Sequence, residues 1–474
     1  MSQLSVAVAA AFAVVASPPF RSAGGVFLCL ALSGGLLGAP AAAASCVDED
    51  RVAAEAPPVA PGEPRAGAVP ADPRATLSAL VQDAVARSHA VGASKLLSEA
   101  ALDDVEEARA ARAIQASVGG GVGPGGSRTV GVSENSAAQV RATLNVSQLL
   151  YDGGRSDRLA DWRAQLAESA RWGLLTVQEQ LALSTVALSL ERSRYRMTAQ
   201  VFRGHVRKMS CLVEALDTIV RTDRGRASEL VQAKKSMQQA ELALSQTQHA
   251  TRQVEVRLRR LVGDGLPSTE GLSTVFGKLP DLAKLVADVE RSREINQLDA
   301  QAAAARRYAD AVAAGGKPQL SWNMAGNAAA GAGGSQGSTR SGSYSVGLTV
   351  NVPLLSPGIE PASNAARKRA QAAQLQRADA LETRRFRVAE VHEQAQAALD
   401  RAQRVAEVLR NSEQVRNFTL QQWQQLGKRS LFDVMGAESD HFNLRVAYVN
   451  ALHDVQQLNA QMLSLGTGVS EWLR

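Results

Sequence analysis

Residues 139–154 read QVRATLNVSQLLYDGG and carry the strongest indication of the fold. Apolar and polar side chains alternate along it: Val140, Ala142, Leu144 and Val146 are apolar, and the residues between them are polar. Strict alternation predicts a strand with one apolar and one polar face. In a transmembrane barrel the apolar face meets lipid and the polar face meets a wet lumen.

Three further strands are expected. The alternation recurs from Gln319 to Met324 and from Ser345 to Val352, and a Gly-rich, weakly patterned segment precedes the first run. We expect strands at about 115–123, 139–150, 318–326 and 343–353, with Gly/Ser-rich loops at Gly119–Ser133 and Ala325–Gly342. Four strands cannot close a membrane barrel, which needs about eight at least. Several copies must therefore share one barrel, and three copies would supply twelve strands.

The chain is an internal duplication. Three short matches occur in one order: Leu77–Leu80 with Leu282–Leu285, Thr143–Val146 with Thr349–Val352, and Gly225–Ser228 with Gly427–Ser430. Their offsets are 205, 206 and 202 residues. Matches at nearly one offset indicate two repeats. Each repeat contains a helix, two strands, a very long helix, a turn and a helix about half as long.

The helices have the apolar period of coiled coils. Apolar residues recur every seven positions from Leu174 to Leu216, and a similar seam runs from Val388 to Leu409. Such a period marks the contact between supercoiled helices. The returning helices carry matching seams at Leu230–Leu261 and Val434–Leu465. A helix over about 156–222 would be a rod of about 100 Å.

These patterns divide the chain into six parts. They are a signal peptide (1–44), a Pro/Ala-rich linker (45–73), a first repeat (74–264, long helix about 156–222), a connector (265–279), a second repeat (280–468, long helix about 360–424) and a C-terminal tail (469–474). Arg21, a short apolar run and Ala42–Ala44 are typical of an export signal. Cys46 follows the cleavage site, and it could be lipidated or form a disulfide with Cys211.

Composition argues against an enzyme. The net charge of +6 is too small and dispersed for a nucleic-acid partner, and the aromatic content of 4% suits helices packed through small residues. The six histidines form no metal-binding pair, and no CxxC occurs. The glycine clusters lie in expected loops and precede no helix with a phosphate-binding Lys. We expect no catalytic residue, no cofactor and no metal.

This organisation resembles the TolC family of outer-membrane channel-tunnels, over about Arg74 to Gly468. The resemblance rests on the strand ends Asn145–Gly154 and Asn351–Leu355 and on the helix turns Gly225–Ser228 and Gly427–Val434. More narrowly, the chain looks like the outer-membrane secretion component of the adenylate cyclase toxin (haemolysin-type) type I exporter. One departure is Gly436, where the family often has a second acid after Asp433.

The resemblance implies a homotrimer in the bacterial outer membrane, with its helices in the periplasm. The fold would be mainly α with a small β part, a twelve-stranded transmembrane β-barrel continuous with an α-helical coiled-coil barrel. Its implied partners are outer-membrane lipid, a periplasmic adaptor, an inner-membrane ABC transporter and a secreted protein cargo. Two other functions stay open: the outer-membrane factor of a small-molecule or multidrug efflux pump, and a periplasmic coiled-coil scaffold outside any membrane.

Two groups of residues are candidate sites. The helix turns lie far from the strands, and we expect them to form a periplasmic entrance and gate, with the candidates Asp433, Glu229, Arg429, Lys428, Gly225, Gly427, Ser228 and Ser430. The resemblance places the constricting acid at Asp433, although solvated charges at a helix N-terminus would look the same. Both serines are expected N-caps. The junction between barrel and helices is expected at Gly153, Gly154, Pro357 and Gly358, where Gly allows unusual φ values.

Overall fold

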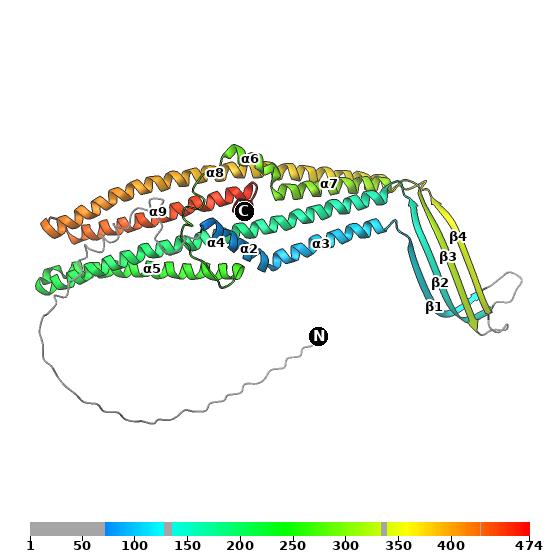
Figure 1. Ribbon diagram of the computed structural model, residues 1–474, viewed down its shortest axis with the longest axis horizontal. Coiled ribbons are helices and arrows are strands. Elements are labelled where there is room, and N and C mark those ends of the chain that lie inside the picture. The colour runs from blue at the N-terminus through cyan, green and yellow to red at the C-terminus, as the bar shows by residue number, and fades with distance from the viewer. Residues whose placement is uncertain (1–71, 128–134, 333–338, 427) are drawn as a thin grey trace, which may run out of the picture. The chain divides into compact units, whose positions relative to one another are not determined.

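The computed structural model describes residues 72–127, 135–332, 339–426 and 428–474. All of them belong to one compact unit of the chain, and Figure 1 shows their helices and strands. The expected signal peptide, nearly all of the linker, Cys46 and Gly427 lie outside the described residues.

The four strands form one antiparallel sheet in the order β1-β2-β3-β4. Their bounds are β1 Gln115–Ser127, β2 Asn135–Tyr151, β3 Gln319–Ala332 and β4 Thr339–Asn351. The central pair is β2 with β3, so the sheet joins the two repeats of the duplication (Figure 1).

The strands extend further than the sequence predicts. β1 runs to Ser127 and β3 to Ala332, past the expected strand ends at about 123 and 326 and into the expected Gly/Ser-rich loops. Gly119 lies opposite Thr143 and Gly121 opposite Arg141, in an unbroken register with β2. Pairing with a neighbouring strand provides the backbone hydrogen bonds, and strand propensity depends strongly on that context. Gly is therefore held in a strand that its own preference does not favour.

The register collects the apolar residues of all four strands on one face. Val118 lies opposite Leu144, and Leu144 lies opposite Gly326, which in turn lies opposite Tyr344. The same face carries Val122, Val140, Ala142, Val146, Leu320, Trp322, Met324, Val346, Leu348 and Val350. The other face is polar, and there Asn323 Nδ2 donates to Thr349 Oγ1 across the β3–β4 pair at 2.7 Å.

The helices include two that are each 68 residues long, α4 Arg155–Thr222 and α8 Ile359–Leu426. Each spans about 100 Å at 1.5 Å per residue. The others are α2 Pro73–Arg87, α3 His89–Ala110, α5 Ala227–Val262, α6 Leu282–Asp288, α7 Arg293–Ala314, α9 Leu431–Leu465 and α10 Val469–Leu473. No helix in the described part of the chain is long and apolar enough to cross a membrane.

The long helices pack as hairpins, α4 against α5 and α8 against α9 (Figure 1). The predicted seam of α5 is correct, since Ala233, Ala240, Thr247, Val254 and Leu258 are all buried. The seam of α8 is also correct, because its buried residues include Val388, Val391, Ala395, Ala398 and Ala402.

The predicted seam of α4 is correct at Met209 and Leu216, which are fully buried, and needs a correction nearer the strands. Leu174, Leu181 and Leu188 are only half-buried, whereas Ala182 and Val186 are fully buried. Helix α4 contacts α2, α3, α5, α7 and α9 along its length. Several neighbours bury a wider face than one coiled-coil partner does, so residues outside the predicted seam, such as Val186 and Leu190, are fully buried too.

The largest core cluster lies where α2, α4, α5 and α10 meet. It contains Leu77, Leu190, Leu258 and Phe276, and Trp472 of α10 packs against it. The C-terminal residues that the sequence analysis called a tail thus include a docked helix. Cys211 of α4 is disulfide-bonded, and Cys46, which could be its partner, lies outside the described residues.

Candidate functional site

The turn from β2 into α4 is capped by Asp152. Its Oδ1 accepts hydrogen bonds from the N–H groups of Gly154 (3.0 Å) and Arg155 (3.1 Å), and its Oδ2 accepts from the N–H of Ser156 (2.6 Å) and from Ser156 Oγ (2.5 Å). Burial alone would raise the pKa of this carboxyl, but the hydrogen bonds outweigh burial and hold the pKa below its ordinary value. The carboxylate thus satisfies the first N–H groups of α4.

Gly153 and Gly154 make this turn with φ values of 68° and 80°. These values lie in the left-handed region, which favours Gly because a Cβ is strained there. A Cβ at Gly153 would also collide with the side chain of Lys317. Lys317 Nζ donates to the Gly153 carbonyl at 3.3 Å. Lys317 lies between α7 and β3, so the bend of the first repeat rests on the second repeat.

The turn from β4 into α8 differs. Pro357 and Gly358 do precede α8, but Gly358 is not among the described glycines with positive φ, and a Cβ there would meet open space. The expectation that Gly supplies an unusual φ is therefore wrong at Gly358. The connection spans residues 352–358 here and only 152–154 in the first repeat. A longer connection can reverse direction with ordinary φ values.

At the first helix turn, Ser228 is not the N-cap that we expected. A short 3₁₀-helix, η1 Arg224–Arg226, runs directly into α5, and Ser228 lies inside α5. Asp223 caps η1 by accepting from the N–H of Gly225 at 3.0 Å. Gly225 is not among the described glycines with positive φ, so the reversal needs no left-handed residue. Glu229 pairs with Arg226, with 2.8 Å between Oε2 and NH2.

At the second helix turn, Ser430 is the N-cap of α9 and forms a capping box with Asp433. Ser430 Oγ accepts from the Asp433 N–H at 3.2 Å, and Asp433 Oδ2 accepts from the Ser430 N–H at 3.1 Å. Arg429 NH1 lies 4.0 Å from Asp433 Oδ2, and Arg429 Nε donates to Gln422 Oε1. The Lys428 N–H donates to the Gln422 carbonyl. The Asp433 carboxylate is thus turned back toward its own helix.

The two hairpins pack together near their turns. One buried cluster joins Leu212 and Leu216 of α4 to Ala233 of α5 and to Leu431 and Val434 of α9. The structure therefore brings the two helix turns, which we expect to form the gate, to the same end of the helical hairpins.

A buried ionic cluster lies nearby and was missed by the sequence analysis. Glu438 of α9 is fully buried, with Lys208 Nζ of α4 3.8 Å from Oε1 and Arg416 NH1 of α8 3.8 Å from Oε2. Charges removed from water need partners, so this cluster links three helices. Its residues are distant in sequence, and no local pattern marks them.

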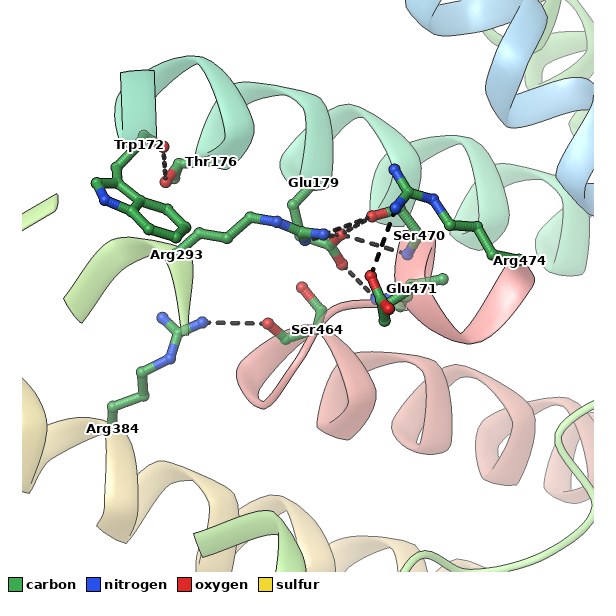
Figure 2. Close-up of polar contacts among 10 residues, drawn as sticks. Trp172, Thr176, Glu179, Arg293, Arg384, Ser464, Ser470, Glu471 and Arg474 are labelled. Atoms are coloured by element: carbon green, nitrogen blue, oxygen red, sulfur yellow. Dashed lines mark hydrogen bonds and ion pairs between the residues drawn. The ribbon is translucent and has the colours of Figure 1, made fainter. Parts of the chain in front are cut away.

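A second missed group joins the two repeats around Glu179 of α4, as Figure 2 shows. Glu179 Oε2 lies 2.5 Å from Arg293 NH1, at the start of α7. Glu179 also accepts from the N–H of Val469 (2.5 Å) and from Ser470 Oγ (2.6 Å), at the start of α10. Gly468, with φ of 118°, leaves room for both partners. One carboxylate therefore holds the C-terminal helix and the second repeat to α4.

Arg384 of α8 extends this group (Figure 2). Its Nε donates to the carbonyl of Leu465 at 2.8 Å and its NH2 to the carbonyl of Ser464 at 3.1 Å, at the end of α9. It also pairs with Glu294. A cation at the last carbonyls of a helix is favourable. The helices α7, α8 and α9 are thus tied together beside Glu179.

The chain is similar to known proteins in its three-dimensional structure. No protein-family model and no curated protein sequence matches the chain. The structure of this chain is similar to that of CusC, whose crystal structures concern folding and transmembrane channel formation. The TM-score is 0.73 and the sequence identity is 16%, and the match covers 83% of this chain and 92% of CusC. The chain has the fold of CusC.

Two further structures have the same fold. The outer membrane protein VceC of Vibrio cholerae has a TM-score of 0.71 and 18% identity, covering 83% of this chain and 97% of VceC. The MtrE outer membrane channel of Neisseria gonorrhoeae has a TM-score of 0.68 and 16% identity, covering 84% and 90%. The predicted fold class, mainly helical with a small β part in a duplicated order, is confirmed.

Proposed function

We propose that this chain is an outer-membrane channel of a tripartite export system and works as a homotrimer. The observation that carries the proposal is the apolar face of the sheet, which is open in the single chain. Val118, Val122 and Tyr344 on this face are 81%, 82% and 85% exposed. An exposed apolar surface of this extent suits lipid and not water. A coiled-coil scaffold outside any membrane would have no use for it.

The edges of the sheet support the trimer. Strands β1 and β4 each pair on one side only within the chain. Unpaired backbone groups are not tolerated in lipid, so each edge needs a partner. Pairing β4 of one copy with β1 of the next removes both edges, and three copies supply the twelve strands of a wide, wet barrel.

The helices extend the duct into the periplasm. The turns at Asp223 and Ser430 are separated from the strands by α4 and α8, each about 100 Å long. This distal end is where a periplasmic adaptor and an inner-membrane ABC transporter would reach the channel. The chain would act as a passage and not as an enzyme, with outer-membrane lipid and protein as its partners.

The narrower resemblance supports a secreted protein toxin as the cargo. Small-molecule or multidrug efflux is the second candidate, because the pump and not the duct selects the cargo. Deletion of this gene is expected to stop toxin secretion. Normal secretion combined with new drug sensitivity would instead assign the chain to efflux.

The test of the proposed function is fractionation of cells that express the full chain. We expect trimers in the outer-membrane fraction that survive detergent at room temperature and dissociate on boiling. Recovery of the protein only in the soluble periplasm would overturn the proposal.

For the gate we propose three copies of Asp433 around the channel axis, which bind divalent cations. Asp433→Asn removes the charge and keeps an oxygen that can accept from the Ser430 N–H. In planar bilayers, divalent block from the periplasmic side is expected to need about tenfold more cation, which corresponds to about 1.4 kcal/mol. Glu168→Gln, which neutralises an exposed acid of α4 away from both turns, is the control. If block is unchanged in Asp433→Asn, the carboxylate acts only in the capping box.

A further inference from the structure

Charge is almost absent from the sheet. Within the described strands β1 to β4, only Arg141 of β2 and Arg340 of β4 are charged. No acid lies in these strands. A charged side chain in a transmembrane strand is costly on the lipid face near the bilayer centre and is useful on the lumen face. The effect of each arginine therefore depends on whether it lies on the apolar or the polar face of the sheet.

The register places the two arginines on opposite faces. Arg141 lies opposite Ala329, and Ala329 lies opposite Ser341, which puts Arg141 on the polar face. Arg340 lies opposite Ala330, and Ala330 lies opposite Val140, which puts Arg340 on the apolar face. Ala329 and Ala330 are adjacent, so the two arginines lie at nearly the same height in the sheet.

Arg141 projects beyond its neighbours on the polar face. The residues opposite it are Gly121 and Ala329, which have minimal side chains. Its guanidinium donates to Gln139 Oε1 from Nε (3.3 Å) and from NH2 (3.1 Å). Gln139 is neutral, so the positive charge is not cancelled by any residue of the described strands.

Arg141 also lies toward the loop end of its strand. It is ten positions before Tyr151, where β2 ends next to the helical part. Ten residues of strand span about 33 Å. In a channel, Arg141 would thus lie in the outer half of the barrel, far from Asp433.

We propose that Arg141 lines the lumen and raises the anion preference of the outer half of the channel. This inference rests on the proposed function, because one arginine per copy becomes a ring of three in a trimer. Rings of Arg or Lys favour anions in pores. The ligand class is a small anion, or an anionic group on the cargo, that passes the ring.

The strength of the effect follows from screening. The Debye length is about 3 Å at 1 M salt and about 30 Å at 0.01 M. A lumen wide enough for cargo leaves its axis several ångströms from the wall. The ring therefore acts across the whole lumen at low salt and only near the wall at high salt.

The experiment measures reversal potentials of the purified full-length trimer in planar bilayers under a KCl gradient. Arg141→Gln is expected to lower the anion-to-cation permeability ratio several-fold at low salt, and Arg141→Glu is expected to lower it further. Both differences should shrink as salt rises. Arg340→Gln, with the same charge removed at the same height on the other face, should keep the wild-type ratio.

A second variant leaves the arginine in place. Gln139→Glu puts an acid beside the guanidinium and should shift selectivity in the same direction as Arg141→Gln. Wild-type selectivity in trimers of Arg141→Glu or Gln139→Glu would overturn the inference. A shift of the permeability ratio in Arg340→Gln as large as that in Arg141→Gln would also overturn it. If wild-type protein forms neither trimers nor channels, the proposed function itself fails, and the two failures are thereby distinguished.

Discussion

Replacing Gly153 and Gly154 together by Val is expected to remove most trimer from the membrane. Both residues have left-handed φ values, 68° and 80°. An L-residue in that region destabilises the fold by about 1–2 kcal/mol, and a β-branched side chain destabilises it by more. A side chain at Gly153 would also displace Lys317. The combined destabilisation of roughly 3–6 kcal/mol is a large part of the usual stability of a folded domain.

The measurement is the fraction of trimer in unboiled membrane samples on a denaturing gel, together with total protein. Gly358→Val is the matched control. Gly358 is the corresponding glycine of the second repeat, but it lacks a positive φ and has open space around its Cα. Its variant should assemble to within about 0.5 kcal/mol of wild type. Normal trimer yield from the double variant would contradict the role assigned to this bend.

Glu179→Ala is expected to release the C-terminal helix and lower the dissociation temperature of the trimer. The variant leaves the largely buried Arg293 without its carboxylate and removes the acceptor for the Val469 N–H and the Ser470 hydroxyl. Breaking a buried, hydrogen-bonded ion pair from one side costs about 3–5 kcal/mol. The C-terminal residues should then become sensitive to proteases in the folded trimer.

Glu168→Ala provides the control on the same helix. Glu168 pairs with Arg171 on the surface, and both side chains are well exposed. Exposed pairs contribute about 0–1 kcal/mol, so little change is expected. Glu179→Met combined with Arg293→Met should recover part of the loss, because no charge is left unpaired. A Glu179→Ala trimer as heat-stable and protease-resistant as wild type would show that α10 is held by its apolar contacts alone.

The two helix turns show which sequence pattern predicts a helix N-cap correctly. Ser430 is followed three positions later by Asp433, and this spacing forms a capping box with both partners on one chain segment. The prediction for Ser430 is confirmed for that reason. Ser228 also precedes an acid, Glu229, but at the wrong spacing, and η1 supplies the start of the helix instead. A serine near a turn is therefore insufficient without the second half of the motif.

The strand-to-helix bends show the same limit. The glycine pair of the first repeat has the predicted backbone, because only three residues connect β2 to α4. The similar position in the second repeat has a longer connection, and Gly358 adopts ordinary φ. The duplication predicts where each bend lies, whereas the length of the connection decides how the chain makes it.

The order of the strands and long helices, the two faces of the strands and the seams of α5 and α8 follow from the sequence alone, because periodicity is a property of neighbouring residues. The remaining features depend on contacts between distant parts of the chain. The length of β1 depends on its pairing with β2, and the opposite placement of Arg141 and Arg340 depends on the register between β2, β3 and β4. Glu179 finds its partners 114 and 290 positions away. Contacts at such separations leave no trace in local spacing, since they form only when the whole chain has folded.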